Sequence, residues 1–205
     1  INHFLRQVSP LIIKPKRFKK IILASKHKYI TLVEIQNSQK RMEVMIPSFN
    51  VNPLLIGIPK NDIIKIHTKI KPLHPDVEEE QKNDYWSAYI VKSKKSSLVR
   101  IEVEFEIQNS ALSKFKCLWI DIEWVNYGPF GSLKRFDGFA LPNSFDKNEE
   151  INCNNNLVDP IKTHILGTLD DPFGILKSYI PVNYLPTDIL TIGESPLAVM
   201  QGRYI

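Results

Sequence analysis

Two segments alternate between apolar and polar residues, and this alternation constrains the fold more than any other feature of the chain. In residues 98–107 every second position is apolar from Ile101 to Ile107, and charged residues fill the positions between. Residues 118–125 repeat the pattern. Side chains of a strand point alternately to its two faces, so a period of two predicts sheets with one face in a core and one face in water.

Several other segments also have strand character. They are residues 29–35, 42–46, 63–71, 85–92 and 133–141. Turn signals separate them, at Asn37-Ser38, Pro53, 57–62, 94–97 and 126–131. Strands of this length joined by such turns predict an antiparallel β-sandwich or barrel.

Composition sets the class of protein. The chain has 205 residues, of which 43% are hydrophobic and 24% charged, so it can form a real core and is expected to be globular. No run of apolar residues is long enough to span a bilayer. Cys117 and Cys153 form no CxxC motif, which argues against a structural zinc site and leaves a disulfide as the minor alternative. No Ser-His-Asp, Cys-His or carboxylate-pair arrangement is recognisable.

The pattern of residues 159–205 differs from that of the β-rich part before it and predicts a strand, a helix, a second strand and a turn into a second helix. The strands are expected at 161–166 and 188–192, which are short and apolar. Asp171 before Pro172 is typical of a helix start. Together these signals predict the start of an α/β domain.

The second helix of this region carries the first candidate site. Ser195 before Pro196 is expected to cap it, and Gly202 is expected to end it. The free N–H groups of a first helical turn can hold an anion such as phosphate. The alternative is an ordinary capped helix with nothing bound. Lys162 could meet the same phosphate, or it could be a lysine at a strand edge.

These signals divide the chain into four parts. They are a basic N-terminal segment at 1–28, a β-sandwich-like domain at 29–142, a polar Asn-rich linker at 143–158 and the start of an α/β domain at 159–205. The fold class predicted is therefore α+β, dominated by the sandwich. Because the chain begins with Ile1 rather than Met, it is expected to be a fragment of a longer protein.

The basic segment allows three interpretations. Its cluster is Lys14, Lys16, Arg17, Lys19 and Lys20. It could be a solvated strand edge, where lysines discourage edge pairing. It could be a juxtamembrane segment, with a membrane tether before residue 1. Nucleic-acid binding ranks last and is not expected, because few aromatic residues are interleaved with the basic ones.

An acidic stretch offers a weaker candidate. His74, Asp76 and the three glutamates at 78–80 could gather around a hard cation. A solvated acidic loop is the preferred interpretation, because adjacent glutamates point in different directions, so no metal ligand is assigned. His67 is expected on a solvent-facing strand surface. Asp170 could lie near a nucleotide or metal, or it could serve the helix start beside Asp171.

The C-terminal region contains PIKTHILG at 160–167 and DILTIGESPLAVMQGR at 188–203. These motifs resemble the amino-terminal end of the γ-glutamyl ligases that add glutamate to the deazaflavin coenzyme F-420. The chain is more similar still to cyanobacterial proteins of that family, in which a β-rich region precedes the ligase-like part. Here that region contains KRMEVMIP, YWSAYIVK and WVNYGPFG.

The resemblance implies GTP-dependent formation of an amide bond to glutamate, with Mn or Mg as metal. It implies a nucleotide and a small-molecule acceptor as partners and a cytoplasmic, membrane-associated location. Lys162, Ser195 and Arg203 are the residues expected to approach the nucleotide. The family lysine falls near Val199, and the family's metal-binding carboxylates lie downstream of Ile205.

The absence of the family lysine near Val199 supports an alternative function from another class of protein. In that alternative the protein is a non-catalytic, membrane-tethered β-sandwich whose ligase-like part is degenerate and serves binding or assembly.

Overall fold

The computed structural model describes residues 8–76, 85–143, 160–180, 185 and 187–203. Within these ranges the strands are β1 (Leu11–Leu23), β2 (Lys26–Asn37), β3 (Val44–Ile46), β4 (Phe49–Ile56), β5 (Ile63–Leu73), β6 (Tyr89–Val91), β7 (Ser96–Ile107), β8 (Cys117–Gly128) and β9 (Gly131–Pro142). Two short 3-10 helices, η1 (Lys60–Asp62) and η2 (Asn109–Lys114), and two α-helices, α2 (Pro172–Tyr179) and α3 (Glu194–Met200), complete them.

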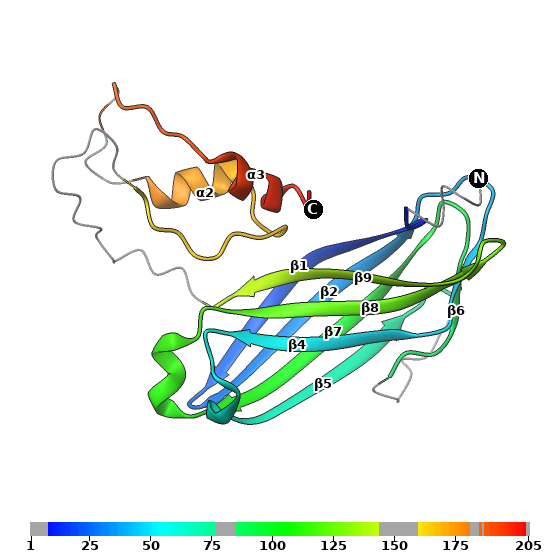
Figure 1. The fold of residues 1–205 in the computed structure, drawn as a ribbon, viewed down its shortest axis with the longest axis horizontal. Coiled ribbons are helices and arrows are strands. Elements are labelled where there is room, and N and C mark those ends of the chain that lie inside the picture. Colours follow the sequence, from blue (N-terminus) through cyan, green and yellow to red (C-terminus); the bar gives the residue numbers. More distant parts are fainter. Residues whose placement is uncertain (1–7, 77–84, 144–159, 181–184, 186, 204–205) are drawn as a thin grey trace.

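The strands form two antiparallel sheets that pack face to face (Figure 1). One has four strands in the order β1-β2-β7-β5. The other has five strands, in which β8 pairs with β4, β3 and β9, and β3 pairs with β6. The mainly antiparallel β-sandwich predicted from the sequence is therefore confirmed.

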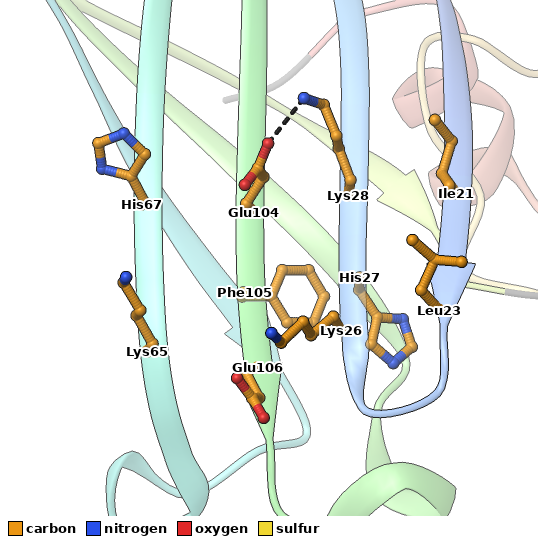
Figure 2. Close-up of a pocket in the computed structure, with 10 residues that line it drawn as sticks. All are labelled: Ile21, Leu23, Lys26, His27, Lys28, Lys65, His67, Glu104, Phe105 and Glu106. Atoms are coloured by element: carbon orange, nitrogen blue, oxygen red, sulfur yellow. Dashed lines mark hydrogen bonds and ion pairs between the residues drawn. The ribbon is translucent and has the colours of Figure 1, made fainter.

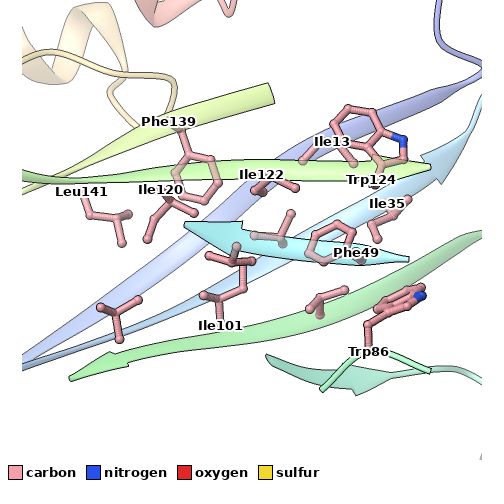
Figure 3. Packing of buried hydrophobic residues seen from close by; sticks show 14 of the residues in the cluster. Ile13, Ile35, Phe49, Trp86, Ile101, Ile120, Ile122, Trp124, Phe139 and Leu141 are labelled. Carbon is pink, nitrogen blue, oxygen red and sulfur yellow. The ribbon is translucent and has the colours of Figure 1, made fainter. Parts of the chain in front are cut away.

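The core lies between the inner faces of the two sheets. Ile101 of β7 is fully buried, and so are Ile120 and Ile122 of β8 in the other sheet (Figure 3). In β2 and β7, paired along their length, the odd-numbered residues are buried and the even-numbered ones face outward. This alternation is the one that the sequence shows, because each strand has one face in the core.

Two strands were not given residue bounds from the sequence, although a strand edge was one interpretation of the basic cluster. Residues 11–28, set apart above as a basic segment, form β1 and the start of β2. Residues 49–56 form β4, although Pro53 was interpreted as a turn signal. That interpretation is wrong because β4 lies at a sheet edge, where a residue without an N–H group can be accommodated.

Helix α2 begins as predicted. Asp171 is the N-cap, and its Oδ2 accepts a hydrogen bond of 2.7 Å from the backbone N–H of Gly174. Pro172 occupies the first turn, where its missing N–H would have no helical partner. The predicted start of this helix is confirmed.

Helix α3 begins earlier than predicted. Its N-cap is Gly193, which makes no side-chain capping bond, so the expectation that Ser195 caps the helix is wrong. Ser195 lies inside the first turn instead. Gly202, with φ of +68°, ends the helix as expected. The N–H groups of Gly202 and Arg203 donate to the carbonyls of Val199 and Ala198, the bond pair of a Schellman motif.

The two strands predicted in the C-terminal region are absent from the described residues. Residues 161–166 and 187–192 adopt no regular secondary structure. An apolar β-branched segment becomes a strand only when a neighbouring strand pairs with it, and the described part of this region supplies none. The linker at 143–158 lies almost wholly outside the described residues, so the domain boundary there stays a prediction.

The C-terminal region contacts the sandwich at one side. Leu169 packs against the core, and Gly167 lies against Ala140 of β9. At the same side, Lys20 Nζ of β1 donates to the backbone and side-chain oxygens of Asn143.

Candidate functional site

The basic cluster lies in a sheet-edge strand. β1 is the outer strand of the four-stranded sheet. Lys16 lies at an irregularity in its pairing and forms a 2.6 Å ion pair with Glu34 of β2. Exposed lysines on an edge strand disfavour pairing with a second chain. Of the three interpretations of this cluster, the strand edge is the one that the topology confirms.

The three residues expected to approach a nucleotide are all exposed. Lys162 lies in an irregular segment, Ser195 in the first turn of α3 and Arg203 just after its end. Ser195 lies near the start of α3 and Arg203 follows its end, and nucleotide binding by these residues stays a prediction.

No cluster of metal ligands is assembled in the described part of the chain. Among those residues, no three His, Cys, Asp or Glu side chains gather as metal ligands. Val199, near which the resemblance places the family lysine, is half-buried in α3. The GTP and metal that the resemblance implies stay predictions, and no catalytic step is derived from the described residues.

A hydrogen-bonded trio in the C-terminal region was missed from the sequence. Nδ1 of His164 lies 2.7 Å from the hydroxyl of Tyr179, and its Nε2 lies 3.1 Å from Oδ1 of Asp170. The imidazole is only 2% exposed. The other oxygen of Asp170 accepts from the N–H of Gly167 at 2.7 Å. The trio ties residues 164–170 to the end of α2 and gives Asp170 a structural role.

The candidate cation site at His74 is a packing cluster. His74 is buried, stacks on Tyr89 at 3.7 Å between ring centroids and contacts Trp86 edge-on. Its Nδ1 lies 2.8 Å from the hydroxyl of Ser97. Burial lowers the pKa of His74, with Asp76 acting in the opposite direction. The described part of the cluster favours a structural histidine, and the glutamates at 78–80 lie outside the described residues.

Asp76 is held at the surface beside the same aromatic ring. Its Oδ1 accepts a 2.7 Å hydrogen bond from the hydroxyl of Tyr89, which lowers the pKa of the carboxyl. Burial raises the pKa of Tyr89, and the hydrogen bond to Asp76 raises it further, to about 12. Nζ of Lys92 lies 3.7 Å from Oδ2 of Asp76. These contacts give Asp76 partners from the protein itself.

A groove of about 460 Å³ lies on the four-stranded sheet near the β1–β2 turn (Figure 2). It is lined by Ile21, Leu23, Lys26, His27, Lys28, Lys65, His67, Glu104, Phe105 and Glu106. The strand register places lysine and glutamate side by side across β2, β7 and β5, as in the row Lys26, Glu106 and Lys65. The groove is therefore amphipathic, with aliphatic residues of β1 at one side and alternating charges at the other.

One lysine of this groove is already neutralised. Nζ of Lys28 lies 2.9 Å from Glu102 and 2.7 Å from Glu104. The hydrogen bond to Glu104 is the largest cause that raises the pKa of Lys28, and the hydrogen bond to Glu102 is the next. Among the described residues, no ion pair engages Lys26 or Lys65, which are exposed. His67 points to solvent, as predicted.

The outer face of the same sheet is strongly basic. By strand register it carries ten Lys or Arg side chains: Lys14, Lys16, Arg17, Lys19, Lys26, Lys28, Lys65, Lys69, Lys71 and Arg100. Its acidic residues are four glutamates: Glu34, Glu102, Glu104 and Glu106. The formal charge of this face is thus +6, whereas the whole chain carries +5.

Two residues that line the groove, His27 and Phe105, belong to a cluster of buried aromatic and polar side chains. The ring of His27 stacks on Phe105 at 5.0 Å, and Phe115 contacts both rings. Burial, and secondarily Lys20, lowers the pKa of His27. Cys117 is buried as a free thiol with its pKa raised by burial to about 11, which makes it a poor nucleophile. Cys153 lies outside the described residues.

The architecture defines the class, because two antiparallel sheets packed around one apolar core form a β-sandwich. A family model described as "F420-0:gamma-glutamyl ligase, N-terminal Ig-like domain" matches residues 13–145. The chain belongs to this family.

Solved structures give only distant likenesses. The GAE domain of yeast GGA1 is 11% identical, with a TM-score of 0.37 over 67% of this chain and 96% of that chain. The FixG-related protein from Vibrio parahaemolyticus is 8% identical, with a TM-score of 0.30 over 65% and 97%. At these TM-scores neither bears on function. A comparison with curated proteins gives no match.

No helix in the described ranges has both the length and the hydropathy needed to cross a bilayer. α2 has eight residues and α3 has seven.

Proposed function

We propose that this chain belongs to a glutamate ligase that forms an amide bond in a GTP-dependent reaction with Mn or Mg. The supporting observation is the family match, which spans nearly the whole sandwich. The C-terminal motifs add support, because they follow the sandwich in the order in which the family's ligase-like part follows its β-rich region. The acceptor would be a small molecule that carries a carboxylate.

In this proposal the sandwich is an accessory domain. Its core is filled with apolar side chains, and buried His74, which pairs with Ser97, serves packing. The chemistry would belong to the ligase-like part, to which Lys162, Ser195 and Arg203 are proposed to contribute phosphate contacts. A hydroxyl or cation at a phosphate contributes a charge-assisted hydrogen bond.

The proposal is tested by calorimetric titration of the full-length protein with GTP and then ATP, each with Mn or Mg. We expect saturable binding of GTP. Ser195→Ala should weaken it roughly tenfold, as the loss of one charge-assisted hydrogen bond predicts. At a GTP concentration of 100 times Kd, the free energy of unfolding should rise by about 2.7 kcal/mol.

Matched controls separate a local effect from a general one. Ser178 is an exposed serine of α2, so Ser178→Ala should leave binding unchanged. Lys177→Ala is the corresponding control for Lys162→Ala. Where binding is confirmed, glutamate transfer to the acceptor is the next measurement. Absence of binding of either nucleotide at millimolar concentration would contradict the ligase proposal.

One observation favours a second candidate. The family lysine that contacts the nucleotide falls near Val199, a half-buried residue of α3, and the described residues after Lys177 include no lysine. In this alternative the protein is a non-catalytic, membrane-tethered binding or assembly module. It predicts that no nucleotide binds while the protein remains folded, a result that the same titration would give.

A further inference from the structure

One end of the sandwich exposes an unusual set of aliphatic side chains. This end, called here the hairpin end, is formed by the β1–β2 turn, η1, η2 and the adjoining strand ends (Figure 1). Its exposed residues include Leu23 at 70%, Ile64 at 60%, Ile22 at 51%, Ile66 at 39% and Ile56 at 37%. Exposed apolar residues also lie elsewhere on the described surface, such as Phe136 and Ile90, so the aliphatic side chains mark the hairpin end as an interaction site only together with the charges around them.

Exposed lysines surround these aliphatic side chains. They are Lys26, Lys60, Lys65, Lys114 and Lys116. The nearby acidic residues Asp62 and Glu106 are both half-buried. Glu106 also accepts a hydrogen bond of 3.2 Å from the hydroxyl of Ser25. The hairpin end is thus both apolar and positively charged.

The adjoining outer face of the four-stranded sheet extends this positive charge. That face carries +6, so all other residues of the chain together carry −1. The charge asymmetry would orient the molecule toward an anionic partner over about one Debye length, roughly 10 Å at 0.1 M salt.

The composition of this surface distinguishes among anionic partners. Protein interfaces are enriched in aromatic residues, Met and Arg and depleted in Lys, whereas the described hairpin end exposes five lysines with isoleucine and leucine. Single-stranded nucleic acids are bound by exposed aromatic side chains, and the outer face has no Phe, Tyr or Trp on its described strand positions. Aliphatic residues flanked by lysines match the interface of an anionic bilayer, where apolar side chains enter the headgroup boundary and lysines contact lipid phosphates.

We propose that the hairpin end docks on the surface of an anionic lipid bilayer. Leu23 and Ile64 would insert at the headgroup boundary, while Lys26 and Lys65 contact anionic headgroups. The basic outer face would add long-range attraction. This peripheral contact does not depend on the ligase proposal and needs no membrane-spanning segment.

The test is sedimentation of the full chain with vesicles. The probes are vesicles of phosphatidylcholine alone and of phosphatidylcholine with phosphatidylglycerol. We expect binding to the anionic vesicles only, weakening steeply as salt rises. Each lysine removed should cost about fivefold in affinity, so Lys26→Glu with Lys65→Glu should lower it more than tenfold. Leu23→Ser should lower it about tenfold with no change in charge.

The matched controls lie at the opposite end of the sandwich. Lys40→Glu with Lys95→Glu changes the net charge by the same amount, and Ile90→Ser removes an aliphatic side chain that is 47% exposed. Both controls should retain most of the binding. Circular dichroism and urea unfolding verify that each variant is folded.

Three outcomes of the vesicle experiment would overturn the proposal. They are failure to bind anionic vesicles at low salt, equal losses in the two double-lysine variants, and full binding by Leu23→Ser. Tighter binding to a DNA duplex than to the vesicles would also overturn it and would identify a nucleic-acid surface instead.

Discussion

His27 places an imidazole without a hydrogen-bond partner inside the core. Among the described residues, neither ring nitrogen has a partner, and the ring is enclosed by Phe105 and Phe115. A buried polar group without a partner costs about 1 to 3 kcal/mol. Burial also lowers the pKa of His27, so the folded state holds fewer protons than the unfolded state. Stability contributed by the neutral ring is then complete above about pH 6.5 and is lost as pH falls toward the lowered pKa.

We therefore expect His27→Phe to stabilise the protein by about 1 kcal/mol and to reduce its sensitivity to acid. The measurement is urea unfolding of both proteins at pH 7.5 and pH 5.5. His74, whose pKa burial also lowers, will leave some pH dependence in the variant. His67→Phe on the exposed face is the control and should retain the pH dependence of the wild type. An equal loss of stability on acidification in wild type and His27→Phe would contradict the assignment.

Tyr179 contributes a hydroxyl that holds His164 in place. It lies 2.7 Å from Nδ1 of the ring, and one hydrogen bond of this kind contributes about 1 kcal/mol. Tyr179→Phe should therefore speed amide exchange in α2 about fivefold, because local opening becomes easier. Tyr127→Phe removes a hydroxyl from an exposed ring and should change nothing. Unchanged exchange in α2 would show that the hydrogen bond does not hold the helix.

At the scale of elements, the sequence predicted the strands whose two faces differ most. β7 and β8 have one face in the core, so their apolar residues alternate, and both were predicted with ends that differ from the structure by at most three residues. β1 has basic residues on both faces near its middle, and β4 contains Pro53, so neither has a clear period. Edge strands tolerate both features, but edge position is a property of topology that no local pattern encodes.

The candidate site was less predictable than the sheets. Ser195 was expected as a cap, but the boundary of α3 lies two residues earlier, at Gly193. The partners His164 and Tyr179 are 15 residues apart, and only the placement of α2 brings them together. The hairpin end combines side chains from four strands and both 3-10 helices. Pairings of this kind follow from the tertiary fold, and no spacing rule along the chain identifies them.

Two glycines with similar backbone angles allow strain and steric clash to be separated. Gly57 follows β4 with φ of +91°, and a Cβ there would lie 2.1 Å from the carbonyl oxygen of Lys114. Gly131 begins β9 with φ of +88° and has nothing within 4 Å of the corresponding position. Positive φ strains any other residue by about 1 to 3 kcal/mol.

Gly131→Ala should therefore cost only that strain, whereas Gly57→Ala should cost clearly more, because backbone atoms must also move. Urea unfolding of the two variants gives the comparison. If both lost the same stability, the turn after β4 would be able to relax away from η2, and the predicted clash would not exist.

At the scale of the whole molecule, the sandwich and the C-terminal region should differ in stability. The sandwich has a continuous core drawn from both sheets. Among the described C-terminal residues, Leu169 alone packs against that core as a partly buried hydrophobic residue. Regions with few buried apolar contacts open locally at lower free energy than the global unfolding. Amides of α2 should therefore exchange through local opening, and those of β2 and β7 only through unfolding of the sandwich.

Leu169→Ala tests this division. It should speed exchange in α2 about tenfold while the urea midpoint of the sandwich hardly moves. Ile101→Ala in the core should instead lower the free energy of unfolding by about 2 to 5 kcal/mol and speed exchange in β7. Hydrogen exchange and urea unfolding on both variants provide the measurements. A fall in the urea midpoint with Leu169→Ala as large as with Ile101→Ala would mean that the two parts unfold as one unit, with the C-terminal region as an integral wall of the sandwich.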